Sequence, residues 1–331
     1  MKNVPAISVS SPMSPMYTYR TRLLGTHISL TLTVPGHAIA QRAFELIRHL
    51  ESLLTVNGDR SLLLEINAAA GRHAVQVPQD IFLMLEKAHV ASLIPGSCFN
   101  LAIGPLVKCW RIGFQGQQVP AEETIQTALN LSRPQNVQLD KASHSVFLSQ
   151  RGMQLDAGAI AKGFIADNVS ALLAAEGIQH SIVNLGGNLV VSGMRHPATC
   201  TPWTLGVQVP FALSDEVLGE FEITDQSVVT SGIYERYFTH QGRLYHHLLD
   251  PATGYPLRST LASVTVIAPS SMDADLFSTL LFGMGIEDGL TFLQRYPTIK
   301  AIFVTRDRHV VCSAAPETLG LKLLKPDYTL A

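Results

Sequence analysis

The sequence predicts an α+β fold in which mixed β-sheets are flanked by helices. Segments with strand-like alternation and segments with helical spacing follow one another without strict βαβ order. Hydrophobic residues make up 47% of the 331 positions and charged residues 15%, a composition typical of a globular protein with a large core. After residue 20 we find no repeat, low-complexity tract or linker, so we expect a disordered lead-in over 1–20 and one domain over 21–331.

The first half of this domain combines helices with short strands. Residues 23–34, LLGTHISLTLTV, are β-branched and partly alternating, which predicts a strand. Apolar residues recur at helical spacing in 38–53 and again in 81–93, so each segment is predicted to be an amphipathic helix. Residues 136–156 are expected to hold two short strands around a Ser/His turn.

The second half is richer in strands. Residues 164–176 predict a helix that ends at Gly177, because glycine accepts the left-handed conformation found after helix ends. Residues 180–193 are typical of two strands joined by a Gly-Gly turn. Further segments predict strands over 202–210, 219–232 and 262–269, a serine-capped helix over 271–285, and a closing hairpin over 300–313 around Arg306–Arg308.

Charge and cysteine content exclude some classes of function. The net charge of −2 gives no bulk electrostatic reason to bind nucleic acid or an anionic membrane, and no continuous apolar segment reaches the roughly 18–20 residues that cross a bilayer. Pro and Ser interrupt the N-terminal segment, so it does not resemble a signal peptide, and no cysteine near it could carry a lipid. The four cysteines lack C-x-x-C spacing. We therefore expect a cytoplasmic protein with reduced thiols.

The segment LDAGAIAKGFIADN suggests an anion site. Gly158 and Gly163 flank Lys162 where a tight loop enters a helix, and the free N–H groups of a helix N-terminus can bind an anion. The spacing is not that of a Walker loop. A tight turn capped by Asp156 explains the same residues equally well. For a second glycine pair, in VNLGGNL, an ordinary hairpin turn is the favoured explanation over a ligand lying on bare backbone.

The segment MDADLFSTLLFGMG places two oxygen-bearing side chains one helical turn apart. Asp275 and Thr279 would share a helix face, and such oxygens suit Mg²⁺, which leaves other coordination places for phosphate and water. Taken alone, the pair is better explained as a helix-start charge and a packed threonine.

The segment HHLLDPATGYP contains more than a turn requires. Asp250, the following Pro and the Thr-Gly pair account for chain reversal, but His247 does not. Together with the glycine-rich loop, the lysine and the oxygen pair, this histidine indicates a phosphate-transfer site.

These motifs occur in the order and at the spacing of a known family. LDAGAIAKGFIAD, VNLGGN, VVTSGIYERYF, HLLDPATGYP, SVTVIAP and ADLFSTLLFGMG resemble the ApbE family of FAD:protein FMN transferases, from about Leu23 to the end of the chain. The resemblance implies an ApbE-like fold and a Mg²⁺-dependent reaction. FAD is cleaved at its pyrophosphate, AMP leaves, and FMN is joined by a phosphoester bond to a threonine of an acceptor flavoprotein.

The resemblance also implies roles for single residues. Asp275 and Thr279 would be side-chain metal ligands, and the carbonyl of Ala159 would be the third ligand from the protein. His247 would activate the acceptor threonine, a task that suits a histidine pKa near 6.5, and Asp250 in the same loop is the second catalytic candidate. His246 would point the other way and tolerate alanine. The residues expected to contact FAD are Leu54, Cys98, Phe99, Asn100, Asp156, Lys162 and Leu249.

The sequence departs from the family pattern at two places. Leu24-Gly25-Thr26 stands where Met-Gly-Thr is usual, and Asn100 and Ala102 replace an acid and a hydroxyl in the segment F-D-x-T-x-G-P-L. Two other functions stay open: a Mg²⁺-dependent FAD pyrophosphatase that passes the phosphoryl group to water, and a flavin-binding protein without chemistry. The Asp275/Thr279 pair argues against the second, because storage of FAD needs no metal at the diphosphate.

Overall fold

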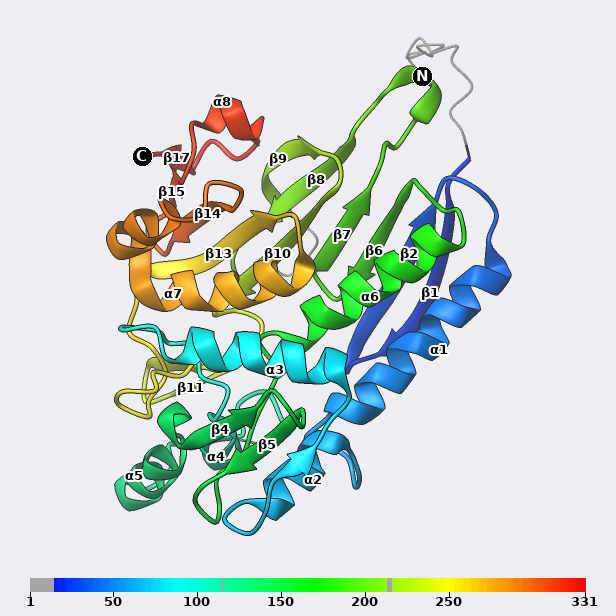
Figure 1. Cartoon of the computed structure of the whole chain (residues 1–331). Coiled ribbons are helices and arrows are strands. Elements are labelled where there is room, and N and C mark those ends of the chain that lie inside the picture. Colours follow the sequence, from blue (N-terminus) through cyan, green and yellow to red (C-terminus); the bar gives the residue numbers. More distant parts are fainter. Residues whose placement is uncertain (1–14, 115, 213–215) are drawn as a thin grey trace.

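The structure is a computed structural model that describes residues 15–331 except 115 and 213–215 (Figure 1). Its first elements are β1 (Tyr17–Leu23), β2 (Thr26–Leu32), α1 (His37–Leu54), α2 (Leu62–Ala69), β3 (Val75–Gln76), α3 (Gln79–Ser92), α4 (Gly104–Trp110), α5 (Glu122–Leu131), η1 (Pro134–Asn136), β4 (Val137–Asp140), β5 (Ser145–Leu148) and α6 (Ala161–Ala175). A run of strands follows: β6 (Ser181–Leu185), β7 (Asn188–Ser192), β8 (Trp203–Gln208), β9 (Val217–Ile223), β10 (Gln226–Gly232), β11 (Tyr237–His240), β12 (Arg243–His246) and β13 (Leu261–Ala268), with η2 (Pro197–Thr199) before β8. The chain closes with α7 (Ser271–Leu293), β14 (Lys300–Thr305), β15 (His309–Cys312), α8 (Pro316–Leu319), β16 (Lys322–Leu323) and β17 (Thr329–Leu330).

A nine-stranded sheet forms the centre of the molecule, with the order β1-β2-β6-β7-β10-β13-β14-β15-β17. Its neighbouring strands are antiparallel except for the parallel pair β15–β17. Three smaller sheets accompany it, with the orders β16-β9-β8, β11-β12 and β3-β5-β4. The predicted α+β class with mixed sheets and flanking helices is confirmed.

Both faces of the large sheet are covered, because alternate residues of its central strands are apolar on both sides. On β14, Phe303 belongs to the main core under α6 and α7, whereas Ile302 and Val304 belong to a second core under β8 and β9. Helices α1, α6 and α7 cover the first face in Figure 1. The sheet is therefore the middle layer between helices and a small antiparallel sheet.

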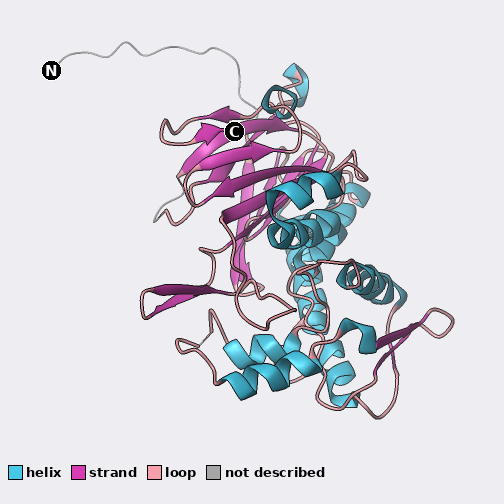
Figure 2. Cartoon of the chain, turned by 90° about the vertical axis from the view of Figure 1, so that its left-hand side faces the viewer, coloured by secondary structure: helices cyan, strands magenta, loops and turns pink. Residues whose placement is uncertain are grey.

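A helix-rich part lies beside this sheet, and Figure 2 separates it from the strand-rich part. The third hydrophobic core of the protein lies in this part, where it joins α4 and α5 to the β11–β12 hairpin and to the loop after it. That core contains Leu106, Trp110, Ile112, Ile125, Ala128, Phe238, Tyr245 and Leu249. Helices from one half of the sequence thus support a loop from the other half.

Most predicted elements are confirmed, with shifted limits. The strand predicted over 23–34 is the second arm of a hairpin whose turn residues, Leu24 and Gly25, both have positive φ. Strand β1 starts at Tyr17, so the ordered domain includes part of the predicted lead-in, while residues 1–14 lie outside the described residues. Helices α2, α4 and α5 were not predicted from the sequence.

Helix α7 begins as predicted and extends beyond the predicted end. Ser270 is the N-cap, and its side chain accepts a hydrogen bond from the Asp273 N–H. Gly285, with φ of 78°, interrupts the helix, which then continues to Leu293. By length and composition α7 could cross a membrane, but 44% of its most apolar window is buried within the protein, where it packs on β10 and β13.

Candidate active site

The glycine-rich loop and the start of α6 form the first wall of the candidate site. The Asp156 carboxylate accepts a hydrogen bond from Gly158 N at 2.8 Å, which shapes the loop. Burial raises the pKa of Asp156, and the charges of Arg236 and Lys108 oppose that rise. Lys162 lies in the first turn of α6.

Gly163 is required where α6 crosses α7. A Cβ at this position would overlap the Ser271 carbonyl and the Met272 backbone, so only glycine allows the two helices to come this close. The contact brings Gly163 N within 2.9 Å of Asp275 Oδ2, to which it donates a hydrogen bond. Gly163 is the third residue of α6, a position whose N–H has no carbonyl partner within the helix, and Asp275 supplies that partner.

Asp275 and Thr279 lie one turn apart on α7, as predicted. Asp275 is only 5% exposed, and burial raises its pKa, while the Lys162 charge and the Gly163 N–H favour the ionised form. Thr279 Oγ1 lies 3.4 Å from Ser231 Oγ on β10. The helix therefore presents one carboxylate and one hydroxyl at the same place.

Cys98 reaches the same helix from a distant segment. Its thiol donates to the Thr279 carbonyl at 2.9 Å, and burial raises the pKa of the thiol to about 12. A Cβ at Gly283 would overlap both Sγ and Cβ of Cys98, so these two positions are in direct contact.

Three other residues predicted to contact FAD have side chains that pack against, or form hydrogen bonds with, other parts of the protein. Leu54 and Phe99 are buried in the main core. The Asn100 side chain donates to the Ser132 carbonyl at 2.7 Å and accepts from Ala102 N at 2.9 Å. The asparagine that departs from the family pattern thus holds the backbone around Cys98 in place.

The loop after β12 holds His247 against the backbone of Arg236. His247 Nδ1 lies 3.2 Å from the Arg236 carbonyl, which can only accept, so Nδ1 carries the proton and Nε2 is the basic nitrogen. Burial and the positive charge of Arg236 lower the pKa of His247 to about 3, and Lys162 acts in the same direction. This environment differs from the unperturbed histidine expected from the sequence, which does not show the packing around the ring or the nearby cations.

His246 and Asp250 have structural partners. His246 is 1% exposed, its Nε2 lies 3.1 Å from the Leu257 carbonyl, and its ring packs edge-on against Phe282. The prediction that His246 tolerates alanine is corrected, since the ring fills a core position. Both carboxylate oxygens of Asp250 accept hydrogen bonds within the turn, from Ala252 N and from the Thr253 hydroxyl. This geometry gives Asp250 the task of shaping the turn, and Leu249 is buried beside it.

The helix-rich part fixes this loop. Trp110 Nε1 donates to the Gly254 carbonyl at 2.7 Å, and the Trp110 ring stacks on Tyr245. The Tyr255 hydroxyl donates to the Glu122 carboxylate on α5. These contacts connect α4 and α5 to the segment that carries His247.

Sequence reasoning missed Arg236, Lys108 and Trp110. Arg236 stands inside the segment VVTSGIYERYF, one of the segments that carry the family resemblance, where its charge could have been noticed. Lys108 and Trp110 lie on a short helix without a side-chain cap, and no sequence signal connected them to the loop.

Comparisons with known proteins agree with the resemblance. Residues 24–303 match the model of the ApbE family. An FAD:protein FMN transferase of Klebsiella pneumoniae (strain 342) is 47% identical over 313 residues, which cover 95% of this chain and 96% of that protein. One from Treponema pallidum is 37% identical over 289 residues, covering 84% and 80%. The apo crystal structure of the Pseudomonas stutzeri flavinyl transferase ApbE superposes with a TM-score of 0.79 at 27% identity, covering 92% and 97%. The ApbE protein of Thermotoga maritima gives a TM-score of 0.78 at 27% identity, covering 93% and 97%.

Proposed function

The chain belongs to the ApbE family of FAD:protein FMN transferases, and from this membership we propose how its residues move FMN from FAD to an acceptor protein. The acceptor hydroxyl oxygen forms a bond to the phosphorus on the FMN side of the diphosphate. The bond from that phosphorus to the bridging oxygen breaks, AMP leaves with that oxygen, and the hydroxyl proton passes to His247 Nε2. The observation that carries this proposal is the hydrogen bond from Gly163 N to Asp275 Oδ2 at 2.9 Å, which joins the first turn of α6, where Lys162 lies, to the face of α7 that carries Asp275 and Thr279.

The residues present fit a magnesium ion. Within the described ranges, no three His, Cys, Asp or Glu side chains gather as a metal cluster, so a cation here would combine the Asp275 carboxylate with neutral oxygens. Thr279 Oγ1 and the carbonyl of Ala159 would supply neutral oxygens, the donor type that Mg²⁺ prefers. When bound, Mg²⁺ neutralises charge that develops on the diphosphate.

In this proposal, Lys162 binds the substrate and His247 accepts the proton. The Lys162 ammonium binds the diphosphate beside Asp275. His247 is held by the Arg236 carbonyl in one tautomer, which keeps Nε2 free to accept the hydroxyl proton. We further propose threonine as the acceptor residue and a cytoplasmic flavoprotein as the acceptor, and both stay predictions from the sequence.

Incubation of the chain with FAD, Mg²⁺ and a candidate acceptor tests the transfer. We expect fluorescence that stays with the acceptor band in a denaturing gel, and AMP released in equal amount. Free FMN with AMP would instead indicate hydrolysis, and unchanged FAD would indicate binding without chemistry. Mass spectrometry of the labelled peptide identifies the acceptor residue.

Lys162→Ala is expected to weaken FAD binding by about tenfold, because a charge-assisted hydrogen bond contributes on the order of 1.5–3 kcal/mol and part of it is recovered by water. Titration calorimetry with FAD measures the change. Lys87→Ala is the matched control, because Lys87 pairs with Asp273 at 2.5 Å on the surface, and it should bind FAD normally. Equal affinity of Lys162→Ala and the parent chain would remove Lys162 from the FAD site.

The contribution of His247 to kcat/KM should show no change with pH near the ordinary pKa of histidine. A pKa of about 3 keeps His247 neutral, and so able to accept a proton, throughout the range from weakly acidic to alkaline pH, and this ability is lost only as the pH falls toward that value. We expect the ratio of kcat/KM for FAD between the parent chain and His247→Ala to stay level from pH 7.5 to 5.5. A free histidine would lower that ratio by about tenfold over this range, and such a drop would contradict the assigned environment.

A further inference from the structure

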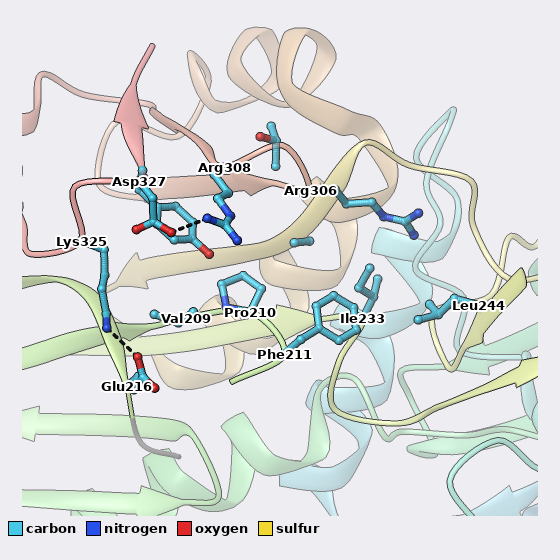
Figure 3. A pocket seen from close by; sticks show the side chains of 13 residues that line it. Val209, Pro210, Phe211, Glu216, Ile233, Leu244, Arg306, Arg308, Lys325 and Asp327 are labelled. Atoms are coloured by element: carbon cyan, nitrogen blue, oxygen red, sulfur yellow. Dashed lines mark hydrogen bonds and ion pairs between the residues drawn. The ribbon is translucent and has the colours of Figure 1, made fainter. Parts of the chain in front are cut away.

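A second hollow lies outside the residues assigned to FAD, the metal ion and the acceptor hydroxyl. It is a pocket of about 470 Å³ between the loop after β8 and the segments that follow β14 and β16 (Figure 3). None of the site residues predicted from the sequence lines it. Its walls are partly charged and partly apolar, so it requires a separate explanation.

The two ends of this pocket differ in character, as Figure 3 shows. At one end Lys325 pairs with Glu216 at 2.5 Å, and Arg308 pairs with Asp327. At the other end Phe211, Ile233 and Leu244 form an apolar wall next to Arg306. The charges at the first end already have partners, which leaves the apolar end to receive a ligand.

Arg306 is the cation of this pocket that can accept a new partner. Its side chain is exposed, and in the described part of the chain it makes no ion pair or side-chain hydrogen bond, unlike Arg308 and Lys325. Its charge reaches His246, where it contributes to the lowered pKa of about 4, after burial. A ligand at the apolar end is therefore favoured if it carries a negative charge.

Two exposed aromatic rings lie at the apolar end, where Phe211 lines the pocket and Tyr237 contacts Phe211. Phe211 is 43% exposed and Tyr237 is 45% exposed, and their rings meet edge-on with centroids 5.7 Å apart. Phe211 also has a φ of 63°, a left-handed conformation that is costly for a bulky residue. Exposed aromatic rings beside an arginine are the side chains that contribute most to binding at protein interfaces.

The apolar end continues into the segment that holds His247. Leu244 precedes His247 by three positions at the end of β12, a span of about 10 Å in an extended strand. Tyr237 pairs with His246 across the hairpin, and it follows Arg236, whose carbonyl holds His247. A polypeptide with its hydroxyl at His247 would need only a few further residues to reach the pocket.

We propose that this pocket docks the acceptor polypeptide, and this inference rests on the proposed transfer function. An acidic side chain of the acceptor pairs with Arg306, and a neighbouring apolar side chain packs on Phe211 and Tyr237. The span to His247 places these two side chains about three to five residues from the modified hydroxyl. The reaction itself needs only a hydroxyl, so this contact selects which protein receives FMN.

A peptide library tests the proposal. It contains one fixed threonine with randomised positions on both sides, and it is incubated with the chain, FAD and Mg²⁺. Flavinylated members are collected by fluorescence and sequenced. We expect Asp and Glu to be enriched roughly fivefold at one position, as a partly exposed charge pair gives. Arg306→Glu should shift the enrichment at that position to Lys and Arg, and Phe211→Ser should reduce the enrichment of apolar residues beside it.

Matched controls separate the possible outcomes. Arg295→Glu changes an exposed cation outside the pocket and should keep the preference of the parent chain. FAD affinity by calorimetry should be the same in all variants. An acidic preference that is absent, or that persists in Arg306→Glu, would overturn the docking proposal. If the parent chain labels no peptide at all, the proposed transfer function fails instead.

Discussion

Asp275→Asn is expected to lower Mg²⁺-dependent FMN transfer by at least roughly 10²–10³-fold, the usual cost of removing one group that stabilises charge in the transition state. Asparagine keeps the shape of the side chain and can still accept the hydrogen bond from Gly163 N. It removes the negative charge that Asp275 would offer to a cation. The measurement is the initial rate of AMP release as a function of Mg²⁺ concentration.

Stability should change in the opposite direction. Burial raises the pKa of Asp275, so the folded protein carries the cost of a desolvated carboxylate, which asparagine avoids. We expect the Tm of the ligand-free variant to be equal to or higher than that of the parent chain. Asp273→Asn is the control, because Asp273 is on the same helix but pairs with Lys87 at the surface. Equal losses of activity in the two variants would rule out a specific role for Asp275.

His247→Ala should reduce transfer by roughly 10²–10⁴-fold, the contribution of a well-placed general base. FAD affinity should change little, because the ring is held by the Arg236 carbonyl and its free Nε2 serves the acceptor hydroxyl. Single-turnover labelling of an acceptor, measured beside FAD binding by calorimetry, separates the two effects.

His246→Ala, the neighbouring substitution, should instead affect folding. Its ring is buried against Phe282, so removal should lower the free energy of unfolding by about 2–4 kcal/mol, as in other large-to-small core substitutions. Chemical denaturation measures this loss. If His246→Ala folds as stably as the parent chain, or if His247→Ala keeps full transfer, the division of roles between the two histidines is wrong.

Local sequence patterns predicted the elements that carry their own signal. Helix α7 has a serine cap and a long apolar pattern, and the turn of β6–β7 has two glycines with positive φ. Helices α4 and α5 were missed because they are short and begin without a side-chain cap. Strand β1, YTYRTRL, carries so many polar residues that only its pairing with β2 identifies it as a strand.

The candidate site divides in the same way. Asp275 and Thr279 are near neighbours on one helix, so their spacing was enough to predict that they share a face. Arg236 and Trp110 act on the histidine loop from other segments, and only the folded chain brings them there. The lowered pKa of His247 is caused mainly by burial, and a sequence motif does not show which residues are buried. The family resemblance implied a role for each residue, and the structure shows which charged groups and hydrogen bonds surround it.

The contact between Cys98 and Gly283 constrains how this chain can evolve. Because a Cβ at 283 would overlap even the Cβ of Cys98, alanine at position 98 makes no room for a side chain on α7. At this spacing of the two backbones, a side chain fits at only one of the two positions. A lineage that moves the side chain from one partner to the other has to pass through a chain with glycine at both, which leaves a gap beside the Thr279 carbonyl. Substitutions at positions 98 and 283 should therefore depend on each other.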